Sequence, residues 1–126
     1  MNSRIVLCFV AVAGLMLGAQ SALAASAAVK EMAGILVHLE HYPSDMEKAR
    51  LKAVADNATS TDQESVVARA ISHLQHKAAD EDKGKLQQIM DDAAVPAEVK
   101  ELAGIILGLD HKPSAADKEK LEMMMK

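Results

Sequence analysis

Aromatic residues and cysteine are scarce in this 126-residue sequence, which has one Tyr, one Phe, no Trp and one Cys. The only cysteine, Cys8, falls in a segment expected to be removed on export, so the remaining chain can form no disulfide and perform no thiol chemistry. The sequence has no H-E-x-x-H or Gly-x-Ser-x-Gly motif, and its paired carboxylates stand at expected helix ends, where water solvates them. We therefore expect a protein that is not an enzyme.

Basic residues are too few and too scattered for a nucleic-acid-binding surface. The 14 Lys and Arg residues are outnumbered by 18 Asp and Glu, which gives a net charge of −4, and lysines alternate with carboxylates along the chain. A protein that binds a phosphate backbone presents a cluster of basic side chains. We therefore expect no nucleic-acid partner.

The first 24 residues have the three parts of a secretory signal peptide. Arg4 supplies the positive start, an apolar run extends over residues 5–17, and Ala22-Leu23-Ala24 matches an A-x-A cleavage pattern. A membrane-spanning helix needs about 20 apolar residues, so an uncleaved anchor is the weaker alternative. Removal of residues 1–24 would leave residues 25–126 as a single periplasmic or secreted domain, without a stable membrane anchor.

An internal repeat organises this predicted mature domain. A shift of 35 residues places His38-Leu39-Glu40-His41 on His73-Leu74-Gln75-His76, and a second shift places His76 on His111. The three units cover residues 29–63, 64–98 and 99–126, of which the last is shortened. A period of this length is typical of stacked supersecondary units.

Each unit is expected to form two helices. The first helix carries apolar residues at helical spacing, which in the first unit are Val29, Met32, Ile35, Leu36 and Leu39. It is expected to end near His41, before Pro43, and Ser44-x-x-Glu47 has the capping-box pattern that opens the second helix. The sequence therefore predicts an all-α fold of three stacked helical hairpins with about six helices, arranged as a short α-solenoid or a compact helical bundle.

Five histidines in repeat-equivalent positions carry the chemical hint in the sequence. His38 and His41 are three residues apart, as are His73 and His76, and this spacing places two imidazoles on one helix face. Two such nitrogens can ligate Cu, Zn or Ni. These four residues are the predicted metal ligands, whereas His111 has no such partner and is expected to contribute little.

The alternative interpretation of the histidines is structural, with no cofactor. A histidine in the last helical turn interacts favourably with the helix dipole and the terminal carbonyls, and a repeat copies such a residue into each unit. Neighbouring helices are expected to lie about 8–10 Å apart, which would keep His41, His76 and His111 from sharing one ion.

The first helix of the third unit is apolar on nearly all sides around Gly104, Leu107 and Gly108. A helix of this kind is buried or forms an interface. These three residues are therefore candidates either for the centre of the stack or for contact with another chain.

Two functions follow from these patterns. The leading hypothesis is an exported, non-catalytic module that binds an unidentified protein or peptide or associates with itself, because repeat stacks present extended surfaces. The alternative is a periplasmic protein that binds Cu, Zn or Ni through the two His-x-x-His pairs.

Overall fold

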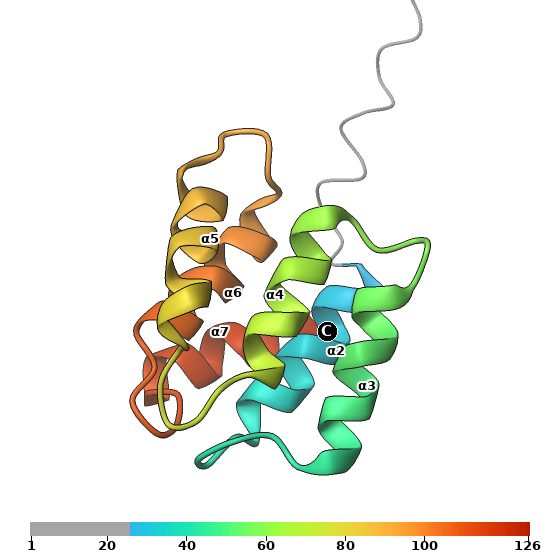
Figure 1. Cartoon of the computed structure of the whole chain (residues 1–126). Coiled ribbons are helices and arrows are strands. Elements are labelled where there is room, and N and C mark those ends of the chain that lie inside the picture. The colour runs from blue at the N-terminus through green and yellow to red at the C-terminus, as the bar shows by residue number, and fades with distance from the viewer. Residues whose placement is uncertain (1–25) are drawn as a thin grey trace, which may run out of the picture.

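The computed structural model describes residues 26–126, which form six α-helices joined by short turns (Figure 1). The helices are α2 (Ala27–Val37), α3 (Asp45–Asp56), α4 (Asp62–Ser72), α5 (Asp80–Asp91), α6 (Ala97–Leu107) and α7 (Ala115–Met125). This architecture confirms the predicted all-α fold. None of these six helices is long and apolar enough to cross a membrane. The predicted signal peptide lies outside the described residues.

Serine and threonine side chains begin four of the six helices. Ser26, Ser44, Thr61 and Ser114 each accept a hydrogen bond from the backbone N–H three residues later. At Ser44 and Thr61 the glutamate three residues later also accepts a hydrogen bond from the backbone N–H of the cap, which completes a capping box. The predicted helix start at Ser44 is therefore confirmed.

The first helix of the first unit ends earlier than predicted. α2 ends at Val37, and the N–H groups of His38 and Leu39 bond to carbonyls three residues back. This tightening of the last turn directs the chain away from the helix axis and buries Leu39, which is 4% exposed. His41 therefore lies in a loop, between the buried Leu39 and the buried Pro43, and not in the last helical turn.

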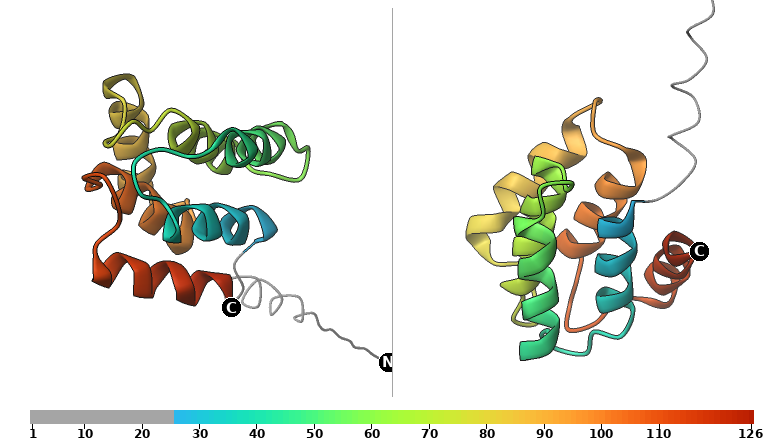
Figure 2. Two further views of the ribbon diagram at one scale, coloured as in Figure 1. Left: turned by 90° about the horizontal axis from the view of Figure 1, so that it is seen from below. Right: turned by 90° about the vertical axis from the view of Figure 1, so that its right-hand side faces the viewer.

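The six helices form a closed bundle. The second helix of each unit packs most extensively on the first helix of the next unit, α3 on α4 and α5 on α6, and α7 returns in the same way to α2. Figure 2 shows α7 alongside α2 in both views. Of the two predicted arrangements, the structure has the compact bundle, in which the first and third units are neighbours.

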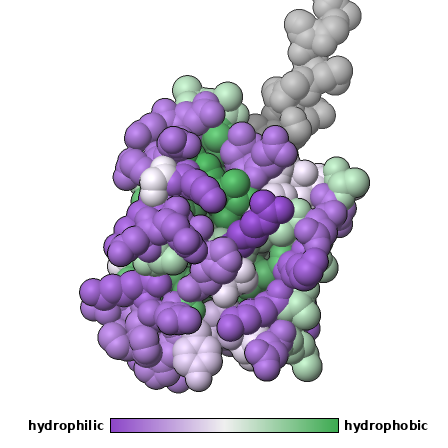
Figure 3. Space-filling view, viewed as in Figure 1, coloured by the Kyte–Doolittle hydropathy of each residue, from purple (hydrophilic) through white to green (hydrophobic). Residues whose placement is uncertain are grey.

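The first helices of the three units form the centre of this bundle. α2, α4 and α6 contact one another, whereas α3, α5 and α7 contact only central helices within the described chain. The repeat-equivalent Leu51, Leu86 and Leu121 are each 0% exposed, and burial of one leucine contributes about 1.5–3 kcal/mol. Polar side chains cover most of the face shown in Figure 3, and apolar residues are visible mainly between the helices.

Candidate metal centre

Three loops meet at one end of the bundle, at the lower end in Figure 1. They comprise residues 38–44, 73–79 and 108–114, and each joins the two helices of one unit. We call them the histidine loops. They meet because the central helices α2, α4 and α6 run in the same direction, so that their C-terminal ends lie together.

Backbone hydrogen bonds join the histidine loops at their central histidines. The N–H of His76 donates to the carbonyl of His41 at 2.9 Å, and the N–H of His111 donates to the carbonyl of His76 at 2.7 Å. The two bonds are repeat-equivalent, since each connects one loop to the loop of the preceding unit. They hold the three histidine backbones side by side whatever the rotation of the side chains.

Two of these histidines have a left-handed backbone conformation that favours glycine. The φ angle is 73° at His76 and 72° at His111. Around His111, the N–H of Lys112 donates to the carbonyl of Asp110 at 2.9 Å, and this bond with that φ describes the rarer, strained form of the γ-turn. Such a conformation costs a non-glycine residue about 1–3 kcal/mol and is concentrated at functional sites.

The side chains of His41, His76 and His111 converge, and we call them the tri-histidine cluster. Their ring centroids are 5.1 Å apart between His41 and His76, 4.7 Å between His76 and His111, and 5.7 Å between His41 and His111. One potential ligand nitrogen from each ring lies within 4.8 Å of the other two, and all three residues are exposed. Nitrogens bound to tetrahedral zinc are about 3.4 Å apart, so the three exposed rings would have to rotate to place their nitrogens around one ion.

The expectation that these three histidines are too far apart to share one ion is therefore wrong. That expectation placed them on helices at helix-packing distance, whereas they lie on loops that converge beyond the helix ends. His111, which was expected to contribute little, belongs to the cluster on the same terms as His41 and His76. The cluster thus takes one histidine from each unit.

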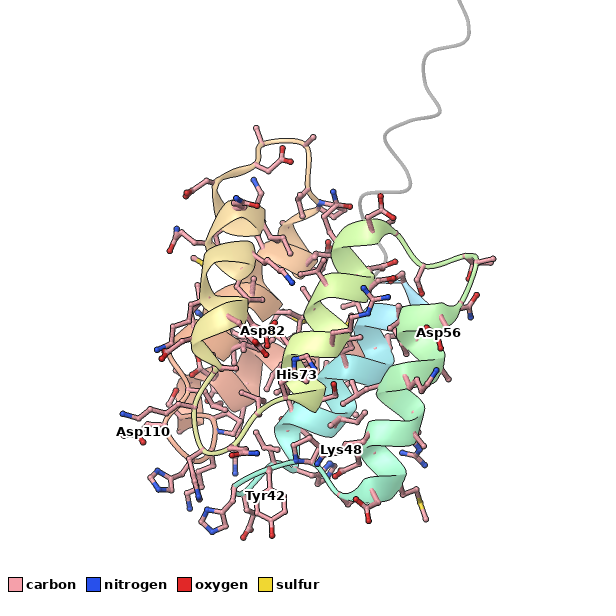
Figure 4. All side chains as sticks on the ribbon, in the orientation of Figure 1. Tyr42, Lys48, Asp56, His73, Asp82 and Asp110 are labelled. Carbon is pink, nitrogen blue, oxygen red and sulfur yellow. The ribbon has the colours of Figure 1, made fainter. Side chains whose placement is uncertain are left out.

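The other two predicted ligands have different partners. His38 and His73 are the C-caps of α2 and α4. His38 Nδ1 lies 3.0 Å from the carbonyl oxygen of Gly34, and His73 Nδ1 lies 2.9 Å from Asp82 Oδ2. In Figure 4 His73 and Asp82 lie between α4 and α5, while Asp110 lies at the histidine-loop end.

His73 also belongs to a second group of potential ligands, with Glu81 and Asp82, whose ligand atoms lie within 4.8 Å of one another. The side chain of Asp82 is 5% exposed, and its carboxylate is already paired with His73. A buried carboxylate needs such a partner. The pair connects the end of α4 to the first turn of α5, and its role is to hold these two helices together.

One member of the tri-histidine cluster, His111, is hydrogen-bonded to a carboxylate. Asp110 Oδ1 lies 2.8 Å from His111 Nδ1. When the imidazole donates this N–H to the carboxylate, Nε2 keeps its lone pair for a metal, and the carboxylate orients the ring. Sequence reasoning missed this pair because adjacent residues on a helix face different directions, whereas these two lie in a tight turn.

Of the three interface candidates in the third unit, Gly104 and Leu107 pack against other side chains of the protein, whereas Gly108 is exposed. A Cβ atom on Gly104 would lie 3.3 Å from Met90 Cε, which shows how closely α5 packs there. Leu107 is half-buried against the core, and Gly108 is the C-cap of α6. Gly104 therefore faces α5, and contact with a second chain stays a prediction.

A hollow of about 360 Å³ lies beside the start of α2 and the end of α3. Its charged lining groups are already paired. Arg50 Nε lies 3.7 Å from Glu31 Oε1, and the carboxylate of Glu64 accepts hydrogen bonds from the Thr61 N–H and the Ser26 hydroxyl. This hollow therefore offers a less specific arrangement of polar groups than the histidine-loop end.

Two carboxylates elsewhere have pKa values below their usual range. A hydrogen bond from Lys52, together with its positive charge, lowers the pKa of Asp56, and Lys83 does the same for the pKa of Asp80. Each is an exposed pair within one helix, and neither contributes to the tri-histidine cluster.

The tri-histidine cluster is thus the place where exposed potential ligands from all three units meet. No protein-family model matches the chain, and neither curated proteins nor solved structures provide a significant match to it.

Proposed function

We propose that this protein binds one divalent transition-metal ion, Zn²⁺, Ni²⁺ or Cu²⁺, through His41, His76 and His111. The observation that carries the proposal is the convergence of one exposed imidazole from each unit, with ligand nitrogens within 4.8 Å of one another. Imidazole nitrogen is a preferred ligand of all three ions. The signal-peptide pattern at residues 1–24 supports a periplasmic or secreted setting for this binding.

The distribution of histidines over the units supports a role beyond helix capping. At the C-cap position the units have His38, His73 and Gly108, so the third unit ends its helix without an imidazole. In the middle of the histidine loop all three units have histidine, and at two of these positions the backbone is strained. A capping role explains the histidines at the C-cap position, but it gives no reason for the histidine in the middle of each histidine loop.

Isothermal titration calorimetry of the purified protein with each ion at neutral pH tests this proposal. We expect one ion per chain. His41→Ala, His76→Ala and His111→Ala should each weaken binding by more than the roughly 10- to 100-fold loss that follows removal of an outer-shell partner. His38→Ala and His73→Ala are the matched controls and should leave the affinity unchanged. Binding should weaken below about pH 6, because imidazole must be neutral to ligate and its ordinary pKa is about 6.5.

Two results would contradict the proposed site. Two ions per chain, with His111→Ala silent, would assign binding to the two His-x-x-His pairs. The absence of saturable binding at micromolar concentrations would exclude a metal function, and the hypothesis of a protein- or peptide-binding module would then be the stronger one.

A further inference from the structure

We infer that the ion held by the tri-histidine cluster takes a small anion from solution, of the carboxylate or other oxyanion class, as an additional ligand. This inference rests on the proposed function and extends it, because it makes the protein a receptor for a metal–anion pair. It follows from the number, charge and surroundings of the protein ligands.

The number of ligands leaves part of the coordination sphere open. The cluster has three members among the described residues. The neighbouring carboxylate, Asp110, is paired with His111 Nδ1, where it orients the ring and is not counted as a ligand of the ion. Zinc in proteins takes at least four ligands, and since all three histidines are exposed, the remaining position is open to solutes.

The charge of the site favours an anion in that position. Three neutral imidazoles leave the two positive charges of the ion uncompensated. The residues next to the histidines in the loops do not change this balance, because the negative charges of Glu40 and Asp110 are matched by the positive charges of Lys77 and Lys112. A bound anion would offset the charge of the ion.

The residues that directly follow the three histidines are hydrogen-bond donors. They are Tyr42, Lys77 and Lys112, at equivalent positions of the three histidine loops, and all are exposed. Figure 4 shows Tyr42 at this end of the bundle. An oxyanion that binds the ion through one oxygen has a second oxygen free to accept a hydrogen bond from such donors. A neutral ligand such as imidazole has no comparable interaction with the lysines.

The test uses Co²⁺ as the ion, because its visible absorption bands respond to the ligands it binds. Acetate added to the Co²⁺-loaded protein should change these bands in a saturable way. The Lys77→Gln/Lys112→Gln variant should bind Co²⁺ as the wild type does, but its acetate affinity should fall by about two- to fivefold for each exposed charge removed. The matched control is Lys30→Gln/Lys100→Gln, which removes the same charge at the repeat-equivalent first turns of α2 and α6, at the opposite end of the bundle. Its acetate affinity should equal that of the wild type, and imidazole should bind all three proteins equally.

The outcomes separate this inference from the proposed function. If Co²⁺ gives no protein-bound bands and calorimetry shows no saturable binding of Zn²⁺, Ni²⁺ or Cu²⁺, the proposed metal site itself is wrong. If Co²⁺ binds but acetate leaves the bands unchanged, the metal site stands and the anion inference is overturned. The inference is also overturned if Co²⁺ makes the protein dimerise in sedimentation experiments, since a second copy would then fill the open position. Equal acetate affinities of the two lysine variants would exclude the contribution of Lys77 and Lys112.

Discussion

Closure of the bundle between α7 and α2 predicts that the last unit contributes as much stability as the others. Leu51, Leu86 and Leu121 occupy equivalent positions in α3, α5 and α7, and each is 0% exposed. Truncation of a fully buried leucine to alanine removes its transfer free energy and leaves a cavity, which together cost about 2–5 kcal/mol. Leu121→Ala should therefore lower the free energy of unfolding by about 2–5 kcal/mol, as Leu51→Ala and Leu86→Ala should.

An open stack of the same six helices predicts a different result. Its terminal helix would contact only its own hairpin partner, and the contacts of α7 with α6 are slight compared with those with α2. Such a helix would fray at little cost, because local opening needs only the contacts of that helix to break. Leu121→Ala would then have a small effect on global unfolding, unlike the two variants in the interior of the chain.

Urea unfolding followed by helical circular dichroism distinguishes these two arrangements, provided that the slope of the transition is the same for all variants. Met123→Ala serves as the control on the same helix, since Met123 is 71% exposed and its truncation should change stability by no more than about 0.5 kcal/mol. If Leu121→Ala is as mild as Met123→Ala while the other two leucine variants are costly, the closed bundle is wrong.

Three further predictions can be checked by the same unfolding measurement. Ser44→Ala should cost about 0.5–2 kcal/mol, because it removes the side-chain cap of α3; an unchanged stability would mean that this helix does not depend on that cap. Gly84→Ala should stabilise the protein by about 1 kcal/mol, because Gly84 is interior to α5 and a Cβ there would have no neighbour within 4 Å. Gly104→Ala should stabilise it less, because a Cβ there would lie 3.3 Å from a methionine side chain, and equal gains would contradict that packing. His73→Ala should cost about 1–3 kcal/mol by leaving the buried Asp82 without its partner, and a neutral result would show that the carboxylate has another one.

Local features of the fold could be predicted from the sequence because neighbouring residues determine them. The apolar residues of the helices recur at helical spacing, and Ser44 with Glu47 forms the capping box that its spacing indicates. The end of α2 was harder to place, because Leu39 continues the helical spacing of apolar residues. Its burial is instead achieved by a chain that has already left the helix at His38.

The candidate site depends on closure, which helical spacing does not specify. The prediction of His-x-x-His pairs assumed that His38 and His41 share a helix, whereas α2 ends at Val37. One signal for the converging histidines was present in the sequence, since His41, His76 and His111 are the histidines that recur in all three units. That signal could not show convergence, because the contact between the first and third units is formed only in the tertiary structure.

If the tri-histidine cluster binds an ion as we propose, metal binding is thermodynamically linked to closure of the bundle. The backbone bonds connect His41 to His76 and His76 to His111, and residues 26–126 contain no equivalent bond from His111 back to His41. An ion bound by all three rings would connect the first and third units across that remaining edge. If it binds only the closed form, it stabilises that form by about 2.7 kcal/mol at one hundred times its dissociation constant. By reciprocity, a change that weakens closure, such as Leu121→Ala, must weaken metal binding wherever it makes the open form significantly populated.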